Sequence, residues 1–263
     1  MRLLNQRGQA TNAMLEALKR FVRICEARVT PFRGSVQFGN RQLTLVRSVW
    51  WNSARQDHFD KEILPYFEAI GPLRPRVILD IGAATGGFSV ASCVAFPDAR
   101  IFAFEPSRRQ RIVLTRNLHA NGFAGRVTIE PIGLWNEEGN LSFRTHGDIS
   151  TLEAVSALPA GLVFGERVRV QTLDAWSRES GLPVVDLIKM DVEGAEIEIL
   201  EGAAATLARS TPMLIVQAYH FRGGKRTLET CKSMLERLGY ACREAGANTG
   251  LLVARKADGL ETG

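Results

Sequence analysis

The sequence predicts an α/β domain with a doubly wound sheet. From residue 77 onward, short apolar runs typical of buried strands alternate with stretches of helical spacing. This alternation favours parallel strands joined by helices. Polar residues or a glycine stand at the carboxyl ends of these runs, where open α/β sheets bind their ligands. The residues at these ends are Asp80, Glu105, Gly133, Asp191 and His220.

The composition indicates a globular protein, because 45% of the 263 residues are hydrophobic and 23% are charged. The formal net charge is +5, and residues 1–60 hold ten basic and four acidic residues, which leaves −1 for the remainder. This basic arm either contacts an anionic substrate or surface, or is a solvated arginine-rich face. The sequence contains no run of about six like charges and no basic patch interleaved with aromatic residues, so nothing in it specifically indicates nucleic acid.

The four cysteines are scattered, without Cys-x-x-Cys or histidine spacing. This pattern favours reduced thiols in a cytoplasmic protein over a disulfide framework or a zinc site. The sequence contains neither a signal-like apolar segment nor an apolar run of about 18 residues, so we expect neither secretion nor a transmembrane span. The cysteines are Cys25, Cys93, Cys231 and Cys242.

We expect two parts in the chain, an N-terminal arm over residues 1–72 and a cofactor-binding domain over 73–263. Polar and aromatic residues, Trp50 and Trp51 among them, are dense just ahead of the first core strand. This density predicts that the arm acts as a substrate lid. The alternative is that the two tryptophans simply pack beneath the arm.

The arm itself contains three expected elements. Apolar residues at helical spacing predict an amphipathic helix over 11–27, for which packing on the domain is favoured over a membrane-surface role. Alternating residues on either side of Gly39-Asn40 predict a β-hairpin over 35–46. A helix is expected over 60–70.

The core begins with a strand that runs into a glycine-rich loop. Val77 to Ile81 is predicted to be a buried strand, Gly82 to Gly86 a tight loop, and a helix follows from Phe88. A second buried strand ends at Glu105. Strand, glycine loop, helix, strand and acid is the layout of a nucleoside-type cofactor site, in which the acid receives the ribose hydroxyls.

The loop residues favour one cofactor of this type. A dinucleotide site needs a second glycine where this chain has Ala84, and no Gly-Lys-Ser/Thr follows to form a P-loop. An acid before the loop and an acid after the next strand, with few phosphate-binding features, suit S-adenosylmethionine. Asp80 and the loop would hold the methionine end, and Glu105 the ribose.

The later segments continue the alternation of strands and helices. Helices are expected over 107–120, where Asn121-Gly122 provides the stop, over 192–207 and over 231–238. Strands are expected over 126–131, 141–144, 167–171, 186–191, 212–219, 240–244 and 250–255. The strands 141–144 and 167–171 are expected to pair antiparallel, and the loop between them carries His146, Asp148, Ser150 and Thr151.

Together these segments resemble FkbM-type S-adenosylmethionine-dependent methyltransferases over roughly residues 75–220. The resemblance lies in Leu79-Asp80-Ile81-Gly82-Ala83 with Gly86, Phe104-Glu105-Pro106, Gly133-Leu134 with Asn136 and Gly139, Gln171-Thr172-Leu173-Asp174, Asp186 to Gly194, and Leu200-Glu201-Gly202-Ala203. It implies a class I, Rossmann-like methyltransferase fold with a seven-stranded, mostly parallel sheet, an antiparallel last strand, and O-methylation as the usual chemistry. The chain departs from the family pattern at Gln217, where glutamate is usual, and at Ala84-Thr85, where the first motif commonly reads Gly-Ala-Asn.

On this basis the cofactor site is expected to consist of nine residues from the strand ends and the loop. They are Asp80, Gly82, Ala83, Thr85, Gly86, Glu105, Pro106, Gly133 and Asp191. No metal is expected to be required, because Asp191 could supply one hard oxygen ligand but Gln217 is a poor second. Lys189 is expected to form an ion pair with a carboxylate of the crevice, and Asp174 to cap a helix.

An alcohol acceptor must lose its proton as it attacks a methyl group, so a base is needed. The candidates are Asp191, Glu193 and His220. His220 has a suitable intrinsic pKa, but a single histidine at a strand end is more often structural. Asp191 is the stronger candidate, with helix capping as its alternative role. Glu193 either binds substrate or holds the turn.

The predicted function is O-methylation of a hydroxyl on a sugar, glycolipid or secondary metabolite. A methyltransferase acting on a protein or RNA is the second hypothesis, with the basic arm as a docking surface. The motif for amino-nitrogen methylation is absent, since the fourth core strand ends in Asp191-Val192-Glu193-Gly194. A non-catalytic module with a cofactor fold is the third hypothesis, and a homo-oligomer is one option for the assembly.

Overall fold

The computed structural model describes most of the chain from the predicted hairpin to the last strand. The described residues are 33–46, 55–146, 149–152, 164–182, 184–222, 224–246 and 248–256. The predicted helix over 11–27, the tryptophans at 50 and 51, Asp148 and Cys25 lie outside the described residues, and the side chains of His146, Ser150 and Thr151 do too.

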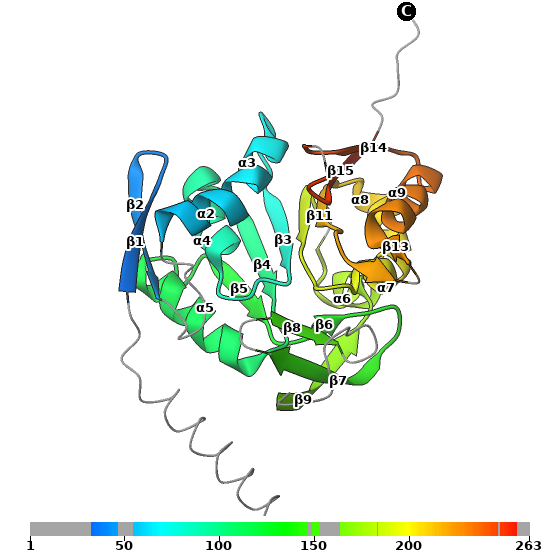
Figure 1. Cartoon of the computed structure of the whole chain (residues 1–263), viewed down its shortest axis with the longest axis horizontal. Helices are drawn as coiled ribbons and strands as arrows, with labels where there is room; N and C mark the ends of the chain where they lie inside the picture. Colours follow the sequence, from blue (N-terminus) through cyan, green and yellow to red (C-terminus); the bar gives the residue numbers. More distant parts are fainter. Residues whose placement is uncertain are drawn as a thin grey trace, which may run out of the picture.

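The centre of the molecule is a seven-stranded sheet in the order β14-β15-β11-β10-β3-β4-β5 (Figure 1). Its parallel strands in the middle are β3 (Val77–Ile81), β4 (Arg100–Phe104), β5 (Val127–Glu130), β10 (Leu187–Met190) and β11 (Met213–Gln217). The last strand, β15 (Leu251–Lys256), is antiparallel to β11 and to β14 (Tyr240–Glu244). The predicted class of fold and the antiparallel last strand are therefore confirmed.

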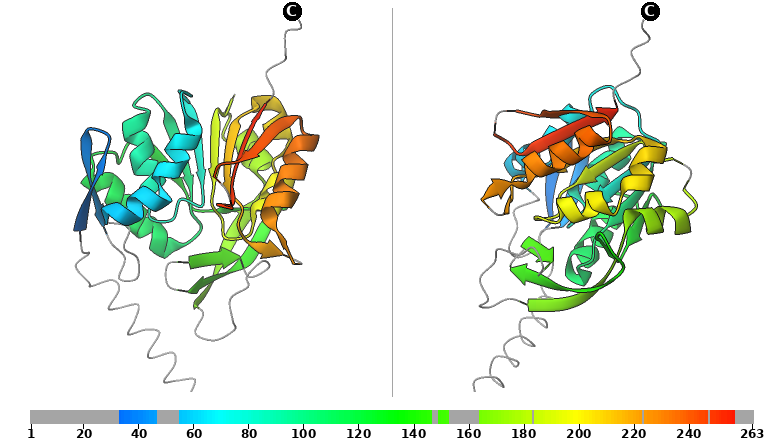
Figure 2. Two further views of the ribbon diagram at one scale, coloured as in Figure 1. Left: turned by 45° about the horizontal axis from the view of Figure 1, so that its top comes forward. Right: turned by 90° about the vertical axis from the view of Figure 1, so that its right-hand side faces the viewer.

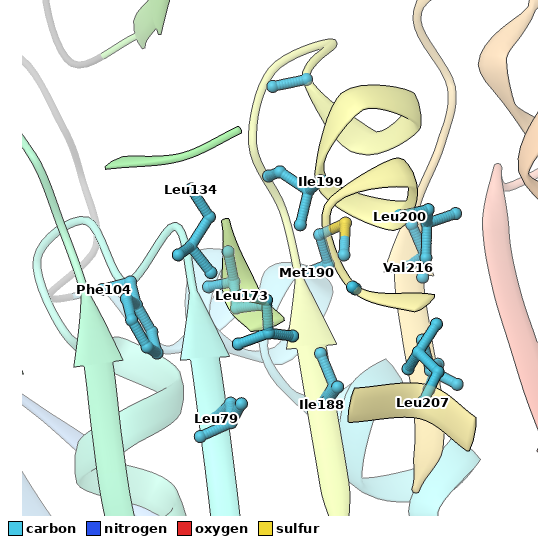
Figure 3. Packing of buried hydrophobic residues seen from close by; sticks show 14 of the residues in the cluster. Leu79, Phe104, Leu134, Leu173, Ile188, Met190, Ile199, Leu200, Leu207 and Val216 are labelled. Carbon is cyan, nitrogen blue, oxygen red and sulfur yellow. The ribbon is translucent and has the colours of Figure 1, made fainter. Parts of the chain in front are cut away.

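Alternate residues of the strands face opposite sides of the sheet, and helices cover both sides. On one side Leu79, Ile188 and Val216 pack beneath the helices that follow β9, β10 and β11 (Figure 3). On the other side Ile78 and Ile215 pack against the earlier helices and the hairpin. The first set is α6 (Leu173–Glu179), α7 (Glu196–Glu201), α8 (Ala204–Ser210) and α9 (Thr227–Arg237), and the second is α2 (Gln56–Glu62), α3 (Leu64–Ile70), α4 (Gly87–Ala95) and α5 (Arg108–Ala120).

The hairpin of the arm, β1 (Arg33–Phe38) and β2 (Arg41–Val46), lies beside α5 in both views of Figure 2. Asn117 of α5 and Asn121 just after it form hydrogen bonds with the backbone of β2. The amide of Asn121 exchanges two hydrogen bonds with the backbone of Thr44, at 2.9 and 2.7 Å, and Asn117 accepts one from the N–H of Val46 at 2.6 Å. The described part of the arm thus shares a core with the sheet.

A second, four-stranded sheet has the order β6-β9-β7-β8. Its strands are β6 (Gly133–Leu134), β7 (Gly139–His146), β8 (Ile149–Leu152) and β9 (Phe164–Gln171). The predicted antiparallel pair is confirmed as β7 and β9, and β6 and β8 enlarge it. A two-stranded ribbon of β12 (Phe221–Arg222) and β13 (Lys225–Arg226) follows β11.

Two predicted helices are interrupted. The helix expected over 60–70 begins at Gln56 and breaks at Ile63, because Pro65 has no N–H to donate. The helix expected over 192–207 is divided into α7 and α8 at Gly202, where a Cβ would lie 2.3 Å from the carbonyl oxygen of Trp135.

The predicted capping role of Asp174 is wrong for its own helix. Thr172 caps α6 by accepting a hydrogen bond from the N–H of Ala175 at 3.0 Å. The carboxylate of Asp174 instead accepts from the N–H groups of Ala205 and Thr206, at 2.9 and 2.7 Å, in the first turn of α8. It therefore satisfies the start of another helix.

Candidate active site

A cavity opens at the carboxyl ends of β3, β4, β10 and β11 and is walled on one side by α2 and α3. Its lining joins apolar, aromatic and acidic side chains from the core and from the arm. Residues on the wall include Leu45, His58, Phe59, Glu62, Ile63, Tyr66, Gly82, Ala83, Ala84, Thr85, Phe88, Glu105, Pro106, Gln110, Ile132, Gly133, Lys189, Asp191, Val192, Glu193, Gln217 and Tyr219.

The loop after β3 lies directly against the end of β10. Gly82 has φ +75°, and a Cβ at that position would lie 1.9 Å from the carbonyl oxygen of Asp191. Ala83, Ala84 and Thr85 line the cavity. Ala84 adopts φ +47° although it is not glycine, so the loop reaches a left-handed conformation at some cost in strain.

Gly86, which is predicted to be part of the cofactor site, is not among the residues that line the cavity. It has φ +84° at the start of α4, and a Cβ there would lie 2.2 Å from Cδ1 of Leu114. Its role in the structure is to let the loop pack against α5.

Glu105 occupies the predicted position at the end of β4, beside Pro106 and across from Gly133 on the cavity wall. Its carboxylate accepts hydrogen bonds from the N–H groups of Ala84 at 2.9 Å and Ser107 at 2.8 Å. Burial raises the pKa of Glu105 to about 7, although these two hydrogen bonds oppose the shift. The acid and the loop are thus held together as one unit.

Asp80 lies beneath the cavity and not on its wall. It is 0% exposed, forms an ion pair with Nζ of Lys189 at 3.0 Å and accepts a hydrogen bond from Oγ of Ser89 at 2.6 Å. Lys189 also donates to the carbonyl oxygen of Gly82 at 2.8 Å. The predicted ion pair of Lys189 is confirmed, and it ties Asp80 to the loop without exposing the acid.

Asp191 follows β10 and lies on the cavity wall. Its Oδ2 accepts a hydrogen bond from the phenolic hydroxyl of Tyr66 at 3.0 Å. Burial raises the pKa of Asp191 to about 6, with Lys189 opposing the shift and Glu193 adding to it. The alternative capping role is not seen, since α7 begins after Ala195 without a side-chain cap.

His220 lies beyond β11 and is held between two acids. Its Nε2 is 2.9 Å from Oε2 of Glu193, and its Nδ1 is 3.4 Å from Oε1 of Glu196. Burial alone would lower the pKa of His220, but the two carboxylates outweigh it and raise the pKa to about 9. Of this group, Glu193 is on the cavity wall.

Sequence reasoning missed Tyr66, Ser89 and Glu196. Tyr66 stands in a helix assigned to the arm, and nothing in its spacing relates it to Asp191, which is far along the chain. Ser89 and Glu196 are short-range neighbours of predicted residues, and their positions in the first turns of the helices after β3 and β10 were the available signal.

The match to a family model decides the relationship of this chain to known proteins. The model of the methyltransferase FkbM domain matches residues 80–246, which is more than half of the chain. This chain belongs to the FkbM methyltransferase family.

Relatives within and near the family are distant. The 2-O-methyltransferase NoeI of Sinorhizobium fredii is 29% identical over 148 residues, which span 51% of this chain and 60% of NoeI. The methyltransferase sdnD of Sordaria araneosa is 31% identical over 62% of this chain and 73% of that protein. The crystal structure of a methyltransferase FkbM from Methylobacillus flagellatus has a TM-score of 0.50 and 20% identity over 76% of this chain and 50% of that one; this likeness shows the fold.

The FkbM family and fold imply S-adenosylmethionine as the cofactor, and the cavity wall fits it. The acids on the described wall are Glu62, Glu105, Asp191 and Glu193. Lys189 on the same wall is already paired with Asp80. Glu193 is paired with His220, which leaves Glu62, Glu105 and Asp191 as the other acids of this wall. This excess of acids disfavours a pyrophosphate and would stabilise a sulfonium cation. Within the described residues, no three His, Cys, Asp or Glu side chains are placed to hold a metal ion, and no helix could cross a membrane.

Proposed function

We propose that this FkbM family member is an S-adenosylmethionine-dependent O-methyltransferase that methylates a hydroxyl of a sugar or secondary metabolite. The observation that carries the proposal is the meeting of the Gly82 loop, Glu105 and Asp191 on one cavity wall. A relative named as a 2-O-methyltransferase supports hydroxyl chemistry. The cofactor, when bound, supplies an electrophilic methyl group.

Different groups of residues on the cavity wall would hold the purine, the ribose and the methionine end of the cofactor. Pro106, Ile132 and Gly133 form the mostly apolar end, suited to a purine ring. Glu105 would receive the ribose hydroxyls, because its two backbone partners leave carboxylate lone pairs available. The loop from Gly82 to Thr85 would hold the methionine end. Asp80 acts indirectly in this proposal, by anchoring Lys189 beneath the loop.

Asp191 is the base in this proposal. It lies on the cavity wall, and its pKa of about 6 makes it ionised yet basic enough to take a proton near neutral pH. His220 is a poorer base, because a pKa of about 9 keeps it protonated at neutral pH. We assign His220 to holding the Glu193 turn.

The acceptor would occupy the part of the cavity away from the apolar end. There the wall is formed by His58 and Glu62 of the arm, by Gln217 at the end of β11 and by Tyr219 after it. Such hydrogen-bonding groups suit a polyhydroxylated acceptor. Aligning an acceptor hydroxyl with the methyl group would itself lower the barrier.

The test combines calorimetric titration with S-adenosylmethionine and transfer of labelled methyl groups to neutral sugars, glycans and secondary-metabolite extracts, with protein and RNA as competing acceptors. We expect Glu105→Ala to abolish cofactor binding, and Asp191→Asn to bind cofactor but lose turnover. Glu68→Gln, at an exposed position on α3, is the control. A folded wild type that neither binds cofactor nor transfers methyl groups would favour a non-catalytic module. Transfer to protein or RNA alone would replace the proposed acceptor class.

A further inference from the structure

Asp191 takes its place on the cavity wall through contacts from several elements. Lys189 of β10 lies close enough to lower the pKa of Asp191, while Glu193 and Glu196, which follow it along the chain, raise it. The hydroxyl of Tyr66 contributes the hydrogen bond to Oδ2 from α3. The hydrogen bond from the neutral Tyr66 hydroxyl therefore orients the Asp191 carboxylate. The other groups act on this carboxylate through their charge, at longer range.

Tyr66 is a rigid donor. Its side chain is 5% exposed and packs edge-on against the ring of Phe88, with ring centroids 5.6 Å apart, while Nζ of Lys189 lies 5.7 Å from the Tyr66 ring centroid. Burial, and then the charge of Asp191, raise the pKa of Tyr66 well above its usual value, so the phenol stays neutral. A neutral phenol donates a hydrogen bond through its O–H group to an acceptor carboxylate.

The helix that carries Tyr66 is itself fixed to the sheet. Nη2 of Arg255 on β15 donates to the carbonyl oxygen of Ile70 at 2.9 Å, at the carboxyl end of α3. Tyr66 and Phe67 of α3 both contact the ring of Phe88. The hydroxyl of Tyr66 is therefore held in place from both the ring and the backbone.

We propose that Tyr66 is a positioning residue for methyl transfer, whose hydroxyl orients the carboxylate of Asp191 by engaging Oδ2 and thereby directs Oδ1 to accept the proton of the acceptor. The inference rests on the proposed function, in which Asp191 is the base. It also places the residue that orients the base in the arm, outside residues 80–246 that match the family model. Tyr66 does not itself touch the reacting atoms in this scheme.

The inference predicts a shift in pH dependence with a definite sign. The hydrogen bond from Tyr66 lowers the pKa of Asp191, as Lys189 does, against burial and the acids Glu193 and Glu196. Glu62 of α2 contributes negative charge near Tyr66. Removing the hydroxyl should raise the pKa of Asp191 and move the acid limb of the kcat profile to higher pH, by about one unit for a hydrogen bond to a charged group.

The decisive variant is Tyr66→Phe, which keeps the ring and its packing. Tyr240→Phe is the matched control, because Tyr240 is also buried and donates to a backbone carbonyl, that of Leu207 at 3.2 Å, away from the cavity. We expect Tyr66→Phe to lower kcat about tenfold with an unchanged dissociation constant for S-adenosylmethionine. The control should leave both unchanged, and Tyr66→Phe should have no further effect on turnover in an Asp191→Asn background.

A second readout does not depend on activity. The carboxyl resonance of Asp191 in protein labelled with ¹³C-aspartate, assigned by its loss in Asp191→Asn, gives the pKa directly in wild type and Tyr66→Phe. An upward shift of about one unit supports the inference. An unchanged resonance, or a kcat loss without a shift of the acid limb, overturns it. Absence of methyl transfer by a wild type whose Asp191 pKa does respond to Tyr66→Phe would instead count against the proposed function.

Discussion

The Gly82 loop approaches the end of β10 closely. An alanine at position 82 should therefore destabilise the fold in two ways, through its positive φ and through a steric conflict with Asp191, and a comparison with a second glycine separates the two. Gly82 and Gly122 both have φ +75°. A Cβ on Gly82 would lie 1.9 Å from the carbonyl oxygen of Asp191, whereas a Cβ on Gly122 would meet nothing within 4 Å. Gly122→Ala therefore reports the conformational cost alone, and Gly82→Ala reports it together with the steric conflict.

The magnitudes follow from these geometries. An alanine held at positive φ costs about 1–2 kcal/mol of folding free energy, and this loss should appear in both variants. At Gly82 the new methyl group must also displace either the loop or the strand end by about 1 Å to reach a 3.0 Å contact with Asp191. Overpacking of this kind adds about 1–3 kcal/mol. The displaced loop should also lose affinity for S-adenosylmethionine.

Urea unfolding monitored by circular dichroism measures the first effect, and calorimetric titration of the folded variants measures the second. We expect Gly82→Ala to be less stable than Gly122→Ala by about 1–3 kcal/mol, with equal slopes in urea. Only Gly82→Ala should bind the cofactor more weakly. Equal stability of the two variants, or full cofactor affinity in Gly82→Ala, would refute the close approach as a constraint on the site.

Three further perturbations test polar contacts of the structure by urea unfolding. Lys189→Met leaves Asp80 buried without its cation and should cost about 3–5 kcal/mol; a neutral result would contradict the pair. Asp174→Ala removes the acceptor at the start of α8 and should cost about 1 kcal/mol, unlike Glu68→Gln. His220→Gln should lose at most about 3 kcal/mol below pH 6.5, and this difference should vanish as the pH rises through about 9; a difference independent of pH would contradict the ion pair.

The parallel strands and the polar residues at their carboxyl ends could be predicted from the sequence, because each buried strand is a continuous apolar run that leads into a polar residue. The pair of Lys189 and Asp80 was foreseeable in part. A lysine inside an apolar run requires a buried partner, and the structure supplies it where Lys189 and Asp80 stand directly opposite in the parallel pairing of β10 with β3. Which acid would pair depended on strand order, which no local pattern specifies.

The contacts that could not be predicted are those between segments distant along the chain. His220, one of the three candidate bases, has the residue type and strand-end position expected of a base, yet its pKa is raised by Glu193 and Glu196, which follow β10. Likewise, the capping acid Asp174 serves α8 because that helix begins beside it in space. In both cases the partner of the residue came from tertiary packing, which the local sequence does not specify.

The wall of the cavity combines residues from inside and from outside the segment that matches the family model. The loop, Glu105 and Asp191 lie within residues 80–246 that match the family model, whereas His58, Glu62 and Tyr66 precede them and still reach the cavity wall. If the proposed function holds, the cofactor end is built by the family segment and the acceptor end partly by the arm. Substitutions at His58 or Glu62 should then change the preferred acceptor while cofactor affinity stays constant. Tyr66→Phe should change neither the preferred acceptor nor the cofactor affinity, because Tyr66 acts on Asp191.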